Sequence, residues 1–549
     1  MYDKKISFAQ LTSDFRWENE LAVFSTDISK GFNFTHEACD RYVGRKKVAI
    51  NWEGAGGQAR TITFDDLSQL TDRVASVLLE NGVRPGDRVS VLMQKIPELY
   101  ASLLAIWKIG AIFVPLFTAF GPEAIRYRLE DSQTKVLITH ERFRGNVEPG
   151  ISGLQRIFVV RPEGASLREG DQDLHEAMKT ATAKVKPATV LPDDTAILLY
   201  TSGSTGMPKG AILSYKFFIF HVPYLRYACW LKPEDHFWCP ADPAWAFGLL
   251  HAFVPMILGS AISAYDAPFY PRYFSKFIKK HGITNLAFTP TGFRVLIATQ
   301  NKLNDVRPLR LRIISSAGET VTPNVIAWAQ ETCGVHVRDH YGFTEGGMLI
   351  CNYNCCDMVI KPGSMGYPVP WHRVSLVDEN GKEVDGKEPA RIAIHKNQYG
   401  FYFKGYWNDE TRTKEAFIGD WFIPADLARK DEDGYYWFEG RVDDVIICAG
   451  YRIGPFEIEN ALIEHPAVME SAVIGAPDTK KGETIIAYVV VKKEYAAQQD
   501  LNRKIMQFIR KKLSKHQLPG KIEFINALPK TPSGKIQKFK LREKHHRNA

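Results

Sequence analysis

The fold of this chain is decided by one stretch, Leu199-Tyr200-Thr201-Ser202-Gly203-Ser204-Thr205-Gly206-Met207-Pro208-Lys209-Gly210. The apolar run from Thr195 to Tyr200 that leads into it predicts a buried β-strand. The glycines that follow permit φ > 0, so successive backbone N–H groups can point into one concavity and hold an anion. The hydroxyls of Ser202, Ser204 and Thr205 and the ammonium of Lys209 stand in the same loop. The stretch therefore predicts a strand that ends in a phosphate-binding loop, with a spacing unlike the GxxxxGK[ST] loop of P-loop proteins.

Outward from this loop, helical and strand-like patterns alternate along the chain. Apolar residues recur at helical spacing in some segments and form short buried runs in others. The predicted order is helix 65–79, strand 88–93, helix 97–109 and strand 111–115. The same rhythm recurs from Ala211 through Ser316. It predicts an α/β fold, in which parallel-rich sheets are covered by helices.

The C-terminal part has a different pattern and is expected to form a small α+β domain of roughly a hundred residues. Helices are predicted over 455–463 and 501–513, and strands over 470–474, 485–491 and 521–525. The short charged link Arg441-Val442-Asp443-Asp444 separates this part from the rest. We therefore expect a large N-terminal domain over 1–442 and a mobile C-terminal domain over 443–549.

The charge of the chain is unevenly distributed. The formal net charge is +8, but residues 501–549 carry 14 Lys and Arg against 2 Asp and Glu, a net +12. The remaining residues therefore sum to −4. The basic segment either steers a polyanion toward the protein or is a solvated basic helix and tail. No nucleic-acid-binding motif accompanies it, so we expect no nucleic-acid partner.

Compartment and membrane signals are weak. Residues 1–6 lack the apolar core of a secretory signal, and Arg547-Asn548-Ala549 is not a peroxisomal address. The stretch Ala244–Tyr265 holds no Asp, Glu, Lys or Arg, but prolines and glycines interrupt it, so no membrane span is expected. Cys351, Cys355 and Cys356 match no standard zinc spacing and are expected to be buried thiols. We expect a cytoplasmic protein.

Further short motifs follow the loop in a fixed order. The motif Thr-Ser-Gly-Ser-Thr-Gly-x-Pro-Lys-Gly resembles the signature loop of the adenylate-forming superfamily. This superfamily includes acyl-CoA synthetases, luciferases and peptide-synthetase adenylation domains. The resemblance spans nearly the whole chain. The other motifs that carry this resemblance are residues 288–291 (FTPT), 316–320 (SAGET), 341–345 (YGFTE), 362–366 (PGSMG), 421–426 (WFIPAD), 440–445 (GRVDDV), 450–459 (GYRIGPFEIE) and 529–535 (PKTPSGK).

The resemblance implies a nucleotide site. The loop would hold the β- and γ-phosphates of ATP, residues 318–320 would form a shelf for adenine, and Tyr341 would stack on the base. Asp426 would accept from the ribose hydroxyls. Many family members carry a Gly directly before this Asp, where this chain has Ala425, so its support differs. The implied ATP- and AMP-binding residues are Thr201, Ser202, Gly203, Ser204, Thr205, Gly206, Lys209, Gly318, Glu319, Thr320, Tyr341, Gly342, Asp426 and Arg441.

The implied reaction has two steps. A carboxylate does not react with a thiol at neutral pH, because oxide is a poor leaving group, and conversion to a mixed anhydride with AMP supplies a good one. Glu345 is the expected Mg²⁺ ligand and Thr344 would bond the α-phosphate. Lys535 would lie between the acid carboxylate and the AMP oxygens. These three are the implied catalytic residues.

The second step would use coenzyme A after the C-terminal domain swings about a hinge at Asp443. Gly450, Tyr451 and Arg452 are the implied coenzyme A-binding residues, with Gly450 leaving room for the thiol arm and Arg452 bonding phosphate.

The sequence predicts the class of the carboxylic acid substrate but not the individual acid. The implied acyl pocket comprises Trp245, Ala246, Phe247, Ala317, Gly342 and Phe343, with Trp245 as an aromatic gate. Acetyl-CoA synthetases carry a Trp where this chain has Gly342, so we expect the missing indole to open space for several carbons. Hydrophobic pockets discriminate by only ~1–3 kcal/mol per methylene, so a range of acids is expected. The expected substrate is a medium-chain, branched or aromatic acid, as in the medium-chain synthetases.

Three other functions compete. The chain could be a stand-alone amino-acid or carboxylic-acid adenylation enzyme that acts with a carrier protein, and Asp242 is compatible with binding a substrate amine. Luciferase-like oxygenation and a non-catalytic nucleotide-binding regulator are the remaining ones. The preferred function is an AMP-forming acyl-CoA synthetase that uses a carboxylic acid, ATP, Mg²⁺ and coenzyme A. Whether it is a monomer or a homodimer stays open.

Overall fold

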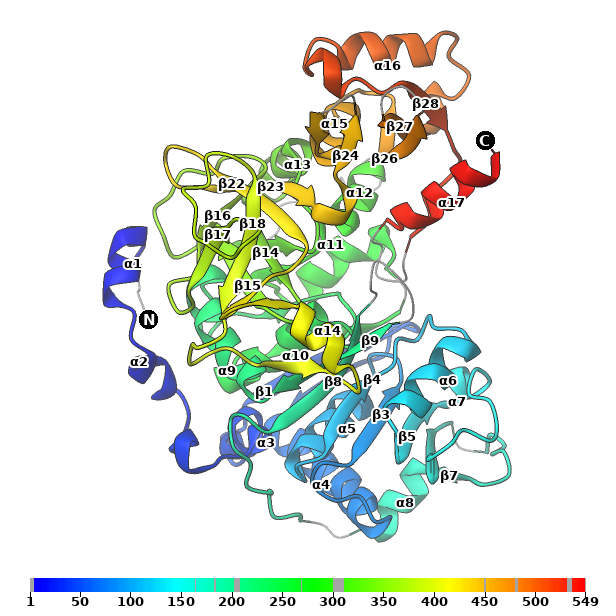
Figure 1. Ribbon diagram of the computed structural model, residues 1–549. Coiled ribbons are helices and arrows are strands. Elements are labelled where there is room, and N and C mark those ends of the chain that lie inside the picture. Colours follow the sequence, from blue (N-terminus) through cyan, green and yellow to red (C-terminus); the bar gives the residue numbers. More distant parts are fainter. Residues whose placement is uncertain are drawn as a thin grey trace. The chain divides into compact units, whose positions relative to one another are not determined.

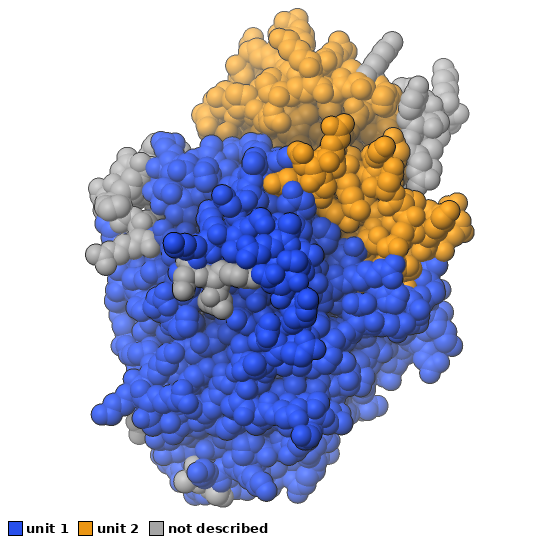
Figure 2. Space-filling model, turned by 90° about the vertical axis from the view of Figure 1, so that its left-hand side faces the viewer, with its two compact units in different colours: residues 1–374, 395–420 blue, residues 375–394, 421–549 orange. Residues whose placement is uncertain are grey.

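The computed structural model describes residues 4–162, 164–181, 184–201, 208–267, 269–299, 311–448, 451–478, 482–530 and 536–548. The chain forms two compact units (Figure 2). Unit 1 comprises residues 1–374 and 395–420, and unit 2 comprises residues 375–394 and 421–549. The expected boundary at 442/443 lies inside unit 2, and the independent movement of residues 443–549 stays a prediction.

The first sheet of unit 1 contains the strand that precedes the predicted loop (Figure 1). Its order is β19-β9-β8-β4-β3-β5-β6-β7. Strands β4, β3, β5, β6 and β7 run parallel and β8 joins them in parallel to β4, whereas β9 turns back antiparallel on β8. The bounds are β3 Arg88–Leu92, β4 Ile112–Pro115, β5 Val136–His140, β6 Arg156–Val160, β7 Asp171–Asp173, β8 Thr195–Thr201, β9 Lys209–Ser214 and β19 Phe403–Tyr406.

The helices that connect these strands match the predicted rhythm. Helix α4 begins with a capping box between Thr63 and Asp66, which satisfies two backbone N–H groups at the helix start. Pro97 at the first position of α5 fits the fixed φ of proline to a helix start. The helices are α4 Phe64–Glu80, α5 Pro97–Lys108, α6 Pro122–Asp131, α7 Glu141–Arg144 and α8 Leu174–Thr180. The predicted alternation of helix and strand over residues 65–115 is confirmed.

The second sheet of unit 1 is parallel from β1 through β14, apart from the edge strand β2, and ends in an antiparallel hairpin. Its order in this unit is β2-β1-β11-β10-β12-β13-β14-β15-β16. The bounds are β1 Val48–Gly54, β2 Ala59–Thr63, β10 Phe237–Trp238, β11 Ile262–Asp266, β12 Asn285–Ala287, β13 Ile313–Ala317, β14 Val337–Phe343, β15 Gly347–Cys351 and β16 Ser364–Pro368. The helices of this part are α9 Lys216–Pro223, a π-helical turn Tyr224–Ala228, α10 Ala246–Ile257, α11 Pro271–Lys280, α12 Pro290–Ala298 and α13 Pro323–Cys333.

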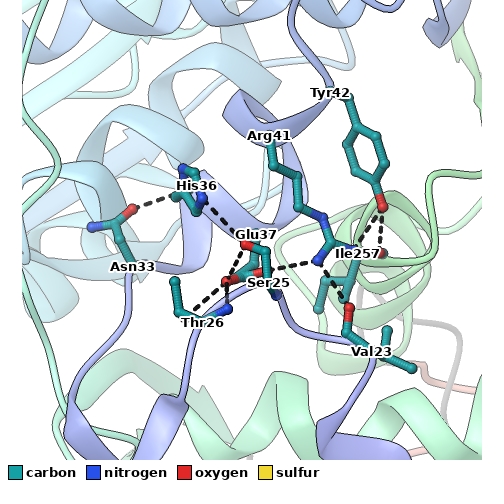
Figure 3. Close-up of polar contacts among 9 residues, drawn as sticks. All are labelled: Val23, Ser25, Thr26, Asn33, His36, Glu37, Arg41, Tyr42 and Ile257. Atoms are coloured by element: carbon teal, nitrogen blue, oxygen red, sulfur yellow. Dashed lines mark hydrogen bonds and ion pairs between the residues drawn. The ribbon is translucent and has the colours of Figure 1, made fainter.

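The apolar stretch from Ala244 to Tyr265 folds as helix α10 followed by strand β11, as expected. Across the described residues, we find no helix that combines the length and the apolar character needed to cross a membrane. The far end of α10 is anchored by a partly buried network (Figure 3). Glu37 accepts from Ser25, Thr26 and Arg41, while Arg41 and Tyr42 both donate to the Ile257 carbonyl at the last turn. A cation at a helix C-terminus is favourable, so the network fixes where α10 ends.

Unit 1 also contains an N-terminal series of short helices and a segment around β19. Their bounds are α1 Phe8–Asp14, α2 Trp17–Leu21, η1 Ile28–Lys30, α3 Phe34–Ala38, η2 Asp40–Tyr42, α14 Glu410–Glu415 and β20 Phe417–Ile418. Cys351, Cys355 and Cys356 are free and buried, and the Cys355 and Cys356 sulfurs lie 3.7 Å apart. The expectation of buried thiols is confirmed.

Unit 2 contains a small antiparallel group and an α+β body. In the antiparallel group, β18 Ala390–His395 pairs with β22 Asp426–Lys430, which pairs with β23 Tyr436–Arg441. Strands β17 Val374–Val377 and β21 Trp421–Phe422 are also neighbours of β18 in the sheet. The α+β body comprises η6 Val442–Asp444, β24 Ile446–Cys448, β25 Tyr451–Ile453, α15 Pro455–Ile463, β26 Val468–Asp478, β27 Gly482–Val491, η7 Lys493–Tyr495, α16 Leu501–Ile509, η8 Lys515–Gln517, β28 Lys521–Phe524 and α17 Lys538–Asn548.

The α+β prediction for the C-terminal part is confirmed, although β24, β25 and α17 were not predicted, β26 is longer than expected and α16 is shorter. Leu501, Ile505 and Ile509 are buried on one face, as the periodicity predicts. The helix ends at Ile509 instead of Leu513. Leu513, the next position of the same apolar repeat, still packs against this core beyond the end of the helix.

Candidate active site

The predicted phosphate loop joins two adjacent antiparallel strands. Thr201 ends β8 and pairs with Lys209, the first residue of β9. The predicted loop residues Ser202, Gly203, Ser204, Thr205 and Gly206 lie outside the described residues. The two strands therefore fix both ends of the loop, and they place the Lys209 side chain beside β19.

Lys209, Tyr406 and Glu345 form one hydrogen-bonded chain. The Lys209 ammonium donates to the Tyr406 hydroxyl over 2.7 Å, and that hydroxyl donates to Glu345 Oε1 over 2.8 Å. The ammonium also lies 4.0 Å from the centre of the Tyr406 ring, a cation–π distance. Burial, together with the adjacent Glu345 carboxylate, raises the pKa of Tyr406 well above its usual range. The phenol therefore stays protonated and holds a cation and an anion on its two sides.

Backbone geometry brings these three side chains together. Glu345 stands in the tight turn between β14 and β15, and it is 8% exposed. Tyr406 ends β19, which pairs with β9 at Ala211. Tyr402 of the same segment donates to the backbone carbonyl of Thr344 over 3.0 Å. Two phenols from one segment thus position the predicted Thr344 and Glu345.

The segment after β13 is held through Glu319. Gly318 has φ +100, a conformation that favours glycine, so the chain turns sharply at the end of the strand. The Glu319 carboxylate accepts from Thr291 Oγ1 over 2.6 Å and pairs with Arg294. Both partners belong to α12. The predicted adenine shelf, Gly318, Glu319 and Thr320, is therefore tied to a neighbouring helix, and its contact with adenine stays a prediction.

The space argument at Gly342 is wrong for this structure. A Cβ atom on Gly342 would lie 2.3 Å from the Gly347 carbonyl oxygen and 2.9 Å from Met348 Cα. The direction that a side chain would take is therefore filled by the backbone of β15. The register of the β14–β15 pair shifts between Tyr341 and Gly342, which brings the two strands close at this point. Replacing an indole by hydrogen here does not open a hole.

The other predicted pocket residues flank the start of α10 and the end of β13. Trp245 is the N-cap of α10, and its ring lies 5.4 Å from that of Phe117 and 6.2 Å from that of Phe120. Ala246 and Phe247 form the first turn, which is partly exposed, whereas every residue from Gly248 to Ile257 is buried. Ala317 is buried at the end of β13. The rings of Tyr341 and Phe343 lie 6.1 Å apart.

In unit 2, Asp426 and Arg441 face each other across paired strands. The Arg441 guanidinium donates to Asp426 Oδ1 over 3.3 Å, and Asp426 is buried. Lys535 and Gly450 lie outside the described residues, as do the side chains of Asp443, Tyr451 and Arg452. Two basic side chains of the C-terminal segment form ion pairs within unit 2: Arg542 pairs with Asp444, and Lys538 pairs with Glu459.

Two family models together match most of the chain. Residues 36–407 match the AMP-binding enzyme family, and residues 457–535 match the AMP-binding enzyme C-terminal domain. The chain belongs to the AMP-binding enzyme family. Members of this family are the adenylate-forming enzymes that the sequence motifs indicated, so that prediction is confirmed.

Similar proteins cover the chain almost completely. An acetyl-coenzyme A synthetase of Bacillus subtilis (strain 168) is 35% identical over 539 residues, which is 96% of this chain and 93% of the relative. The crystal structure of a Brucella canis acyl-CoA synthetase has a TM-score of 0.79 at 36% identity and covers 99% of both chains. The structure of an anthranilate CoA ligase in complex with anthranoyl-AMP has a TM-score of 0.84 at 29% identity, covering 95% of this chain and 99% of that one. This AMP-binding enzyme is an AMP-forming CoA ligase.

Sequence reasoning missed Tyr406 as a site residue of this AMP-binding enzyme. A tyrosine in a Gly-Tyr-Trp stretch is usual for a core strand. Its hydroxyl is brought beside the side chain of Lys209 only by the pairing of β19 with β9. Tyr402, Thr291 and Arg294 were missed as positioning residues for the same reason. Thr291 alone carried a signal, because it belongs to one of the ordered motifs.

Proposed function

We propose that this CoA ligase activates a medium-chain, branched or aromatic carboxylic acid with MgATP and then transfers the acyl group to coenzyme A. The observation that carries the proposal is the Lys209–Tyr406–Glu345 chain. It holds a cation and a carboxylate at fixed positions beside the phosphate loop. Such preorganised charges suit a reaction that develops charge on transferred phosphate.

Glu345 fits the requirements of a magnesium ligand. Mg²⁺ takes oxygen ligands, with few from the protein and the rest from water and phosphate. Glu345 Oε1 is oriented by Tyr406, and its Oε2 has no hydrogen-bond partner in the part of the chain that the structure describes. When bound, the ion would neutralise phosphate charge.

The chain's own residues would share the first step as follows. Lys209 and the loop hydroxyls bind the phosphates that leave as pyrophosphate. Thr344 bonds the α-phosphate, with its backbone held by Tyr402. Asp426, supported by Arg441, binds the ribose. Lys535 would lie between the acid carboxylate and AMP, where its compact ammonium would offset the repulsion of two anions.

For the second step, residues 443–549 would move about Asp443 and exchange the Lys535 loop for the Gly450 segment. Tyr451 and Arg452 then line the path of the coenzyme A arm. Separate conformations for the two steps avoid the need for one site to bind pyrophosphate and a thiol at once.

The acid class is supported by the first turn of α10 and by a relative. Ala246 and Ala317 are small, whereas Phe247 and Phe343 are aromatic, a combination that suits an apolar acid with a flat or slender body. The anthranilate CoA ligase shares the fold over nearly the full length of this chain. The carrier-protein alternative is less favoured, because Asp242 accepts from the Ala244 backbone N–H and shapes the turn before α10.

The test is an acid panel with purified protein, MgATP and coenzyme A. Acids of two to twelve carbons and unsubstituted and ring-substituted aromatic acids are each assayed for AMP release and thioester formation. We expect pyrophosphate exchange without coenzyme A and thioester only when it is added. Glu345→Gln is the negative control. Exchange without any thioester product would overturn the ligase function in favour of carrier-dependent adenylation.

A further inference from the structure

Three buried histidines lie close together in unit 1, and one of them differs from the other two. His221 is on α9, His251 on α10 and His340 on β14, and each is at most 1% exposed. Burial lowers the pKa of all three, to about 4 for His221 and about 3 for His251 and His340. All three rings are therefore neutral at physiological pH, with one N–H donor and one bare acceptor nitrogen each.

The partner atoms assign which nitrogen carries the proton. His221 Nδ1 lies 2.6 Å from the Phe217 carbonyl and His251 Nδ1 lies 2.8 Å from the Phe247 carbonyl. A carbonyl oxygen only accepts, so Nδ1 is the donor in both rings and Nε2 is the acceptor. The two residues thus make the same bond to the turn that precedes them, four residues back.

The acceptor nitrogens of His221 and His340 are satisfied. His221 Nε2 accepts from the Met348 backbone N–H over 3.3 Å. In His340, Nε2 donates to the Asn352 carbonyl over 3.1 Å, so Nδ1 is the acceptor and takes the Tyr224 hydroxyl hydrogen over 2.9 Å. The Tyr224 hydroxyl proton is therefore used by His340, although the Tyr224 and His251 rings are 5.8 Å apart.

His251 Nε2 is the exception. It is a fully buried atom that has no hydrogen-bond partner among the residues the structure describes. Buried polar atoms in folded proteins are almost always paired, so this acceptor is available to a donor from outside the chain, either an ordered water or a group on a bound molecule. The unmet acceptor is aligned by the Nδ1 bond to Phe247.

The surroundings of His251 define the kind of donor. Phe237 stacks on the His251 ring at 5.5 Å and Phe247 packs against it at 4.4 Å. His251 is one turn deeper than Phe247, or about 6 Å along the helix axis. A planar, apolar ring suits these aromatic neighbours. The strong lowering of the His251 pKa marks a site that disfavours a cation, so the donor is a neutral group.

We propose that His251 Nε2 accepts a hydrogen bond from a hydroxyl or neutral amino group on the ring of an aromatic acid substrate. The inference rests on the proposed function and narrows its acid class to ring-hydroxylated or ring-aminated aromatic acids. His251 is then a specificity-determining residue one helical turn beyond Phe247, a residue of the predicted acyl pocket. An acid that carries methyl at the same position leaves the acceptor unpaired and is disfavoured.

The experiment compares the hydroxy-, amino- and methylbenzoate isomers, with benzoate as reference, in the full-length enzyme. We expect at least one hydroxylated or aminated isomer to exceed the methyl isomer of the same position by about 10- to 100-fold in kcat/KM. In His251→Leu the ratio should fall to within about threefold, with benzoate still converted. His251→Gln, which keeps an acceptor, should restore part of the ratio.

His221→Leu is the matched control. It removes an equivalent buried histidine whose acceptor is already paired, so it should lower the thermal stability and leave the hydroxyl-to-methyl ratio unchanged. Equal rates for the hydroxyl and methyl isomers in the parent, or an unchanged ratio in His251→Leu, would overturn the inference. Failure of every acid to form a thioester would instead overturn the proposed function. In that case the rise in melting temperature that each acid produces on binding is measured instead. A larger rise with the hydroxyl or amino isomer than with the methyl isomer, in the parent but not in His251→Leu, would still support the role of His251.

Discussion

Tyr406→Phe is the sharpest test of the proposed phosphate site. The substitution removes one oxygen atom and leaves the ring, so the cation–π contact with Lys209 at 4.0 Å can persist. It deletes the donor to Glu345 Oε1 and the acceptor for Lys209. Hydrogen bonds to charged groups contribute about 1.5–3 kcal/mol each, and Tyr406 is 6% exposed, so solvent replaces them poorly.

We expect the effect to fall on MgATP. If the loss of orientation costs about 1.4–2.8 kcal/mol in the transition state, kcat/KM for MgATP falls by about 10- to 100-fold. The assay is ATP–pyrophosphate exchange at saturating acid and varied MgATP. Tyr353→Phe is the matched control, because it removes a buried phenol hydroxyl that donates only to the Pro368 carbonyl. A Tyr406→Phe enzyme within twofold of the parent, beside an inactive Glu345→Gln, would refute the role of the chain of hydrogen bonds.

Further outcomes follow from other residues. Lys535→Ala should abolish adenylation and leave thioester formation from supplied acyl-AMP largely intact, and near-normal pyrophosphate exchange would contradict this. Asp443→Pro should uncouple the two half-reactions, because proline fixes φ near −65°, and unchanged overall turnover would place the pivot elsewhere. Burial holds the His251 pKa at about 3, below the unfolded value, so its stabilising effect is present above pH 6.5 and is lost as the pH falls toward 3. We therefore compare the free energy of unfolding of His251→Leu and of the parent by chemical denaturation between pH 6 and pH 4. This free energy should change with pH by about 1.4 kcal/mol per pH unit less in His251→Leu than in the parent. An equal pH dependence in the two proteins would show that His251 does not titrate there.

The sequence predicted what depends on local patterns. Local apolar periodicity predicted β8, the alternation of α4, β3, α5 and β4, and the helix–strand pair α10–β11. This periodicity is a property of neighbouring residues and does not depend on the tertiary structure. What depends on long-range pairing was not predicted. Tyr406 meets Glu345, which lies 61 positions earlier in the chain, only because β19 pairs with β9, and no local pattern carries that information. The orphan nitrogen of His251 likewise becomes visible only when every neighbouring donor has been assigned to its acceptor.

Gly342 shows why residue volume alone is a poor guide to pocket size. The direction of a side chain is set by the backbone, and here it leads into the Gly347 carbonyl at 2.3 Å, because the register of the hairpin shifts beside it. Gly342→Ala should therefore push β14 from β15 and displace the turn that carries Glu345. We expect adenylation to fall for all acids in parallel, with a loss of stability of about 1–3 kcal/mol. The measurement is kcat/KM across the acid panel, with the midpoint of unfolding. A variant that keeps full activity but turns to acetate and propionate would mean that the added methyl group points into the pocket, and would restore the argument from size.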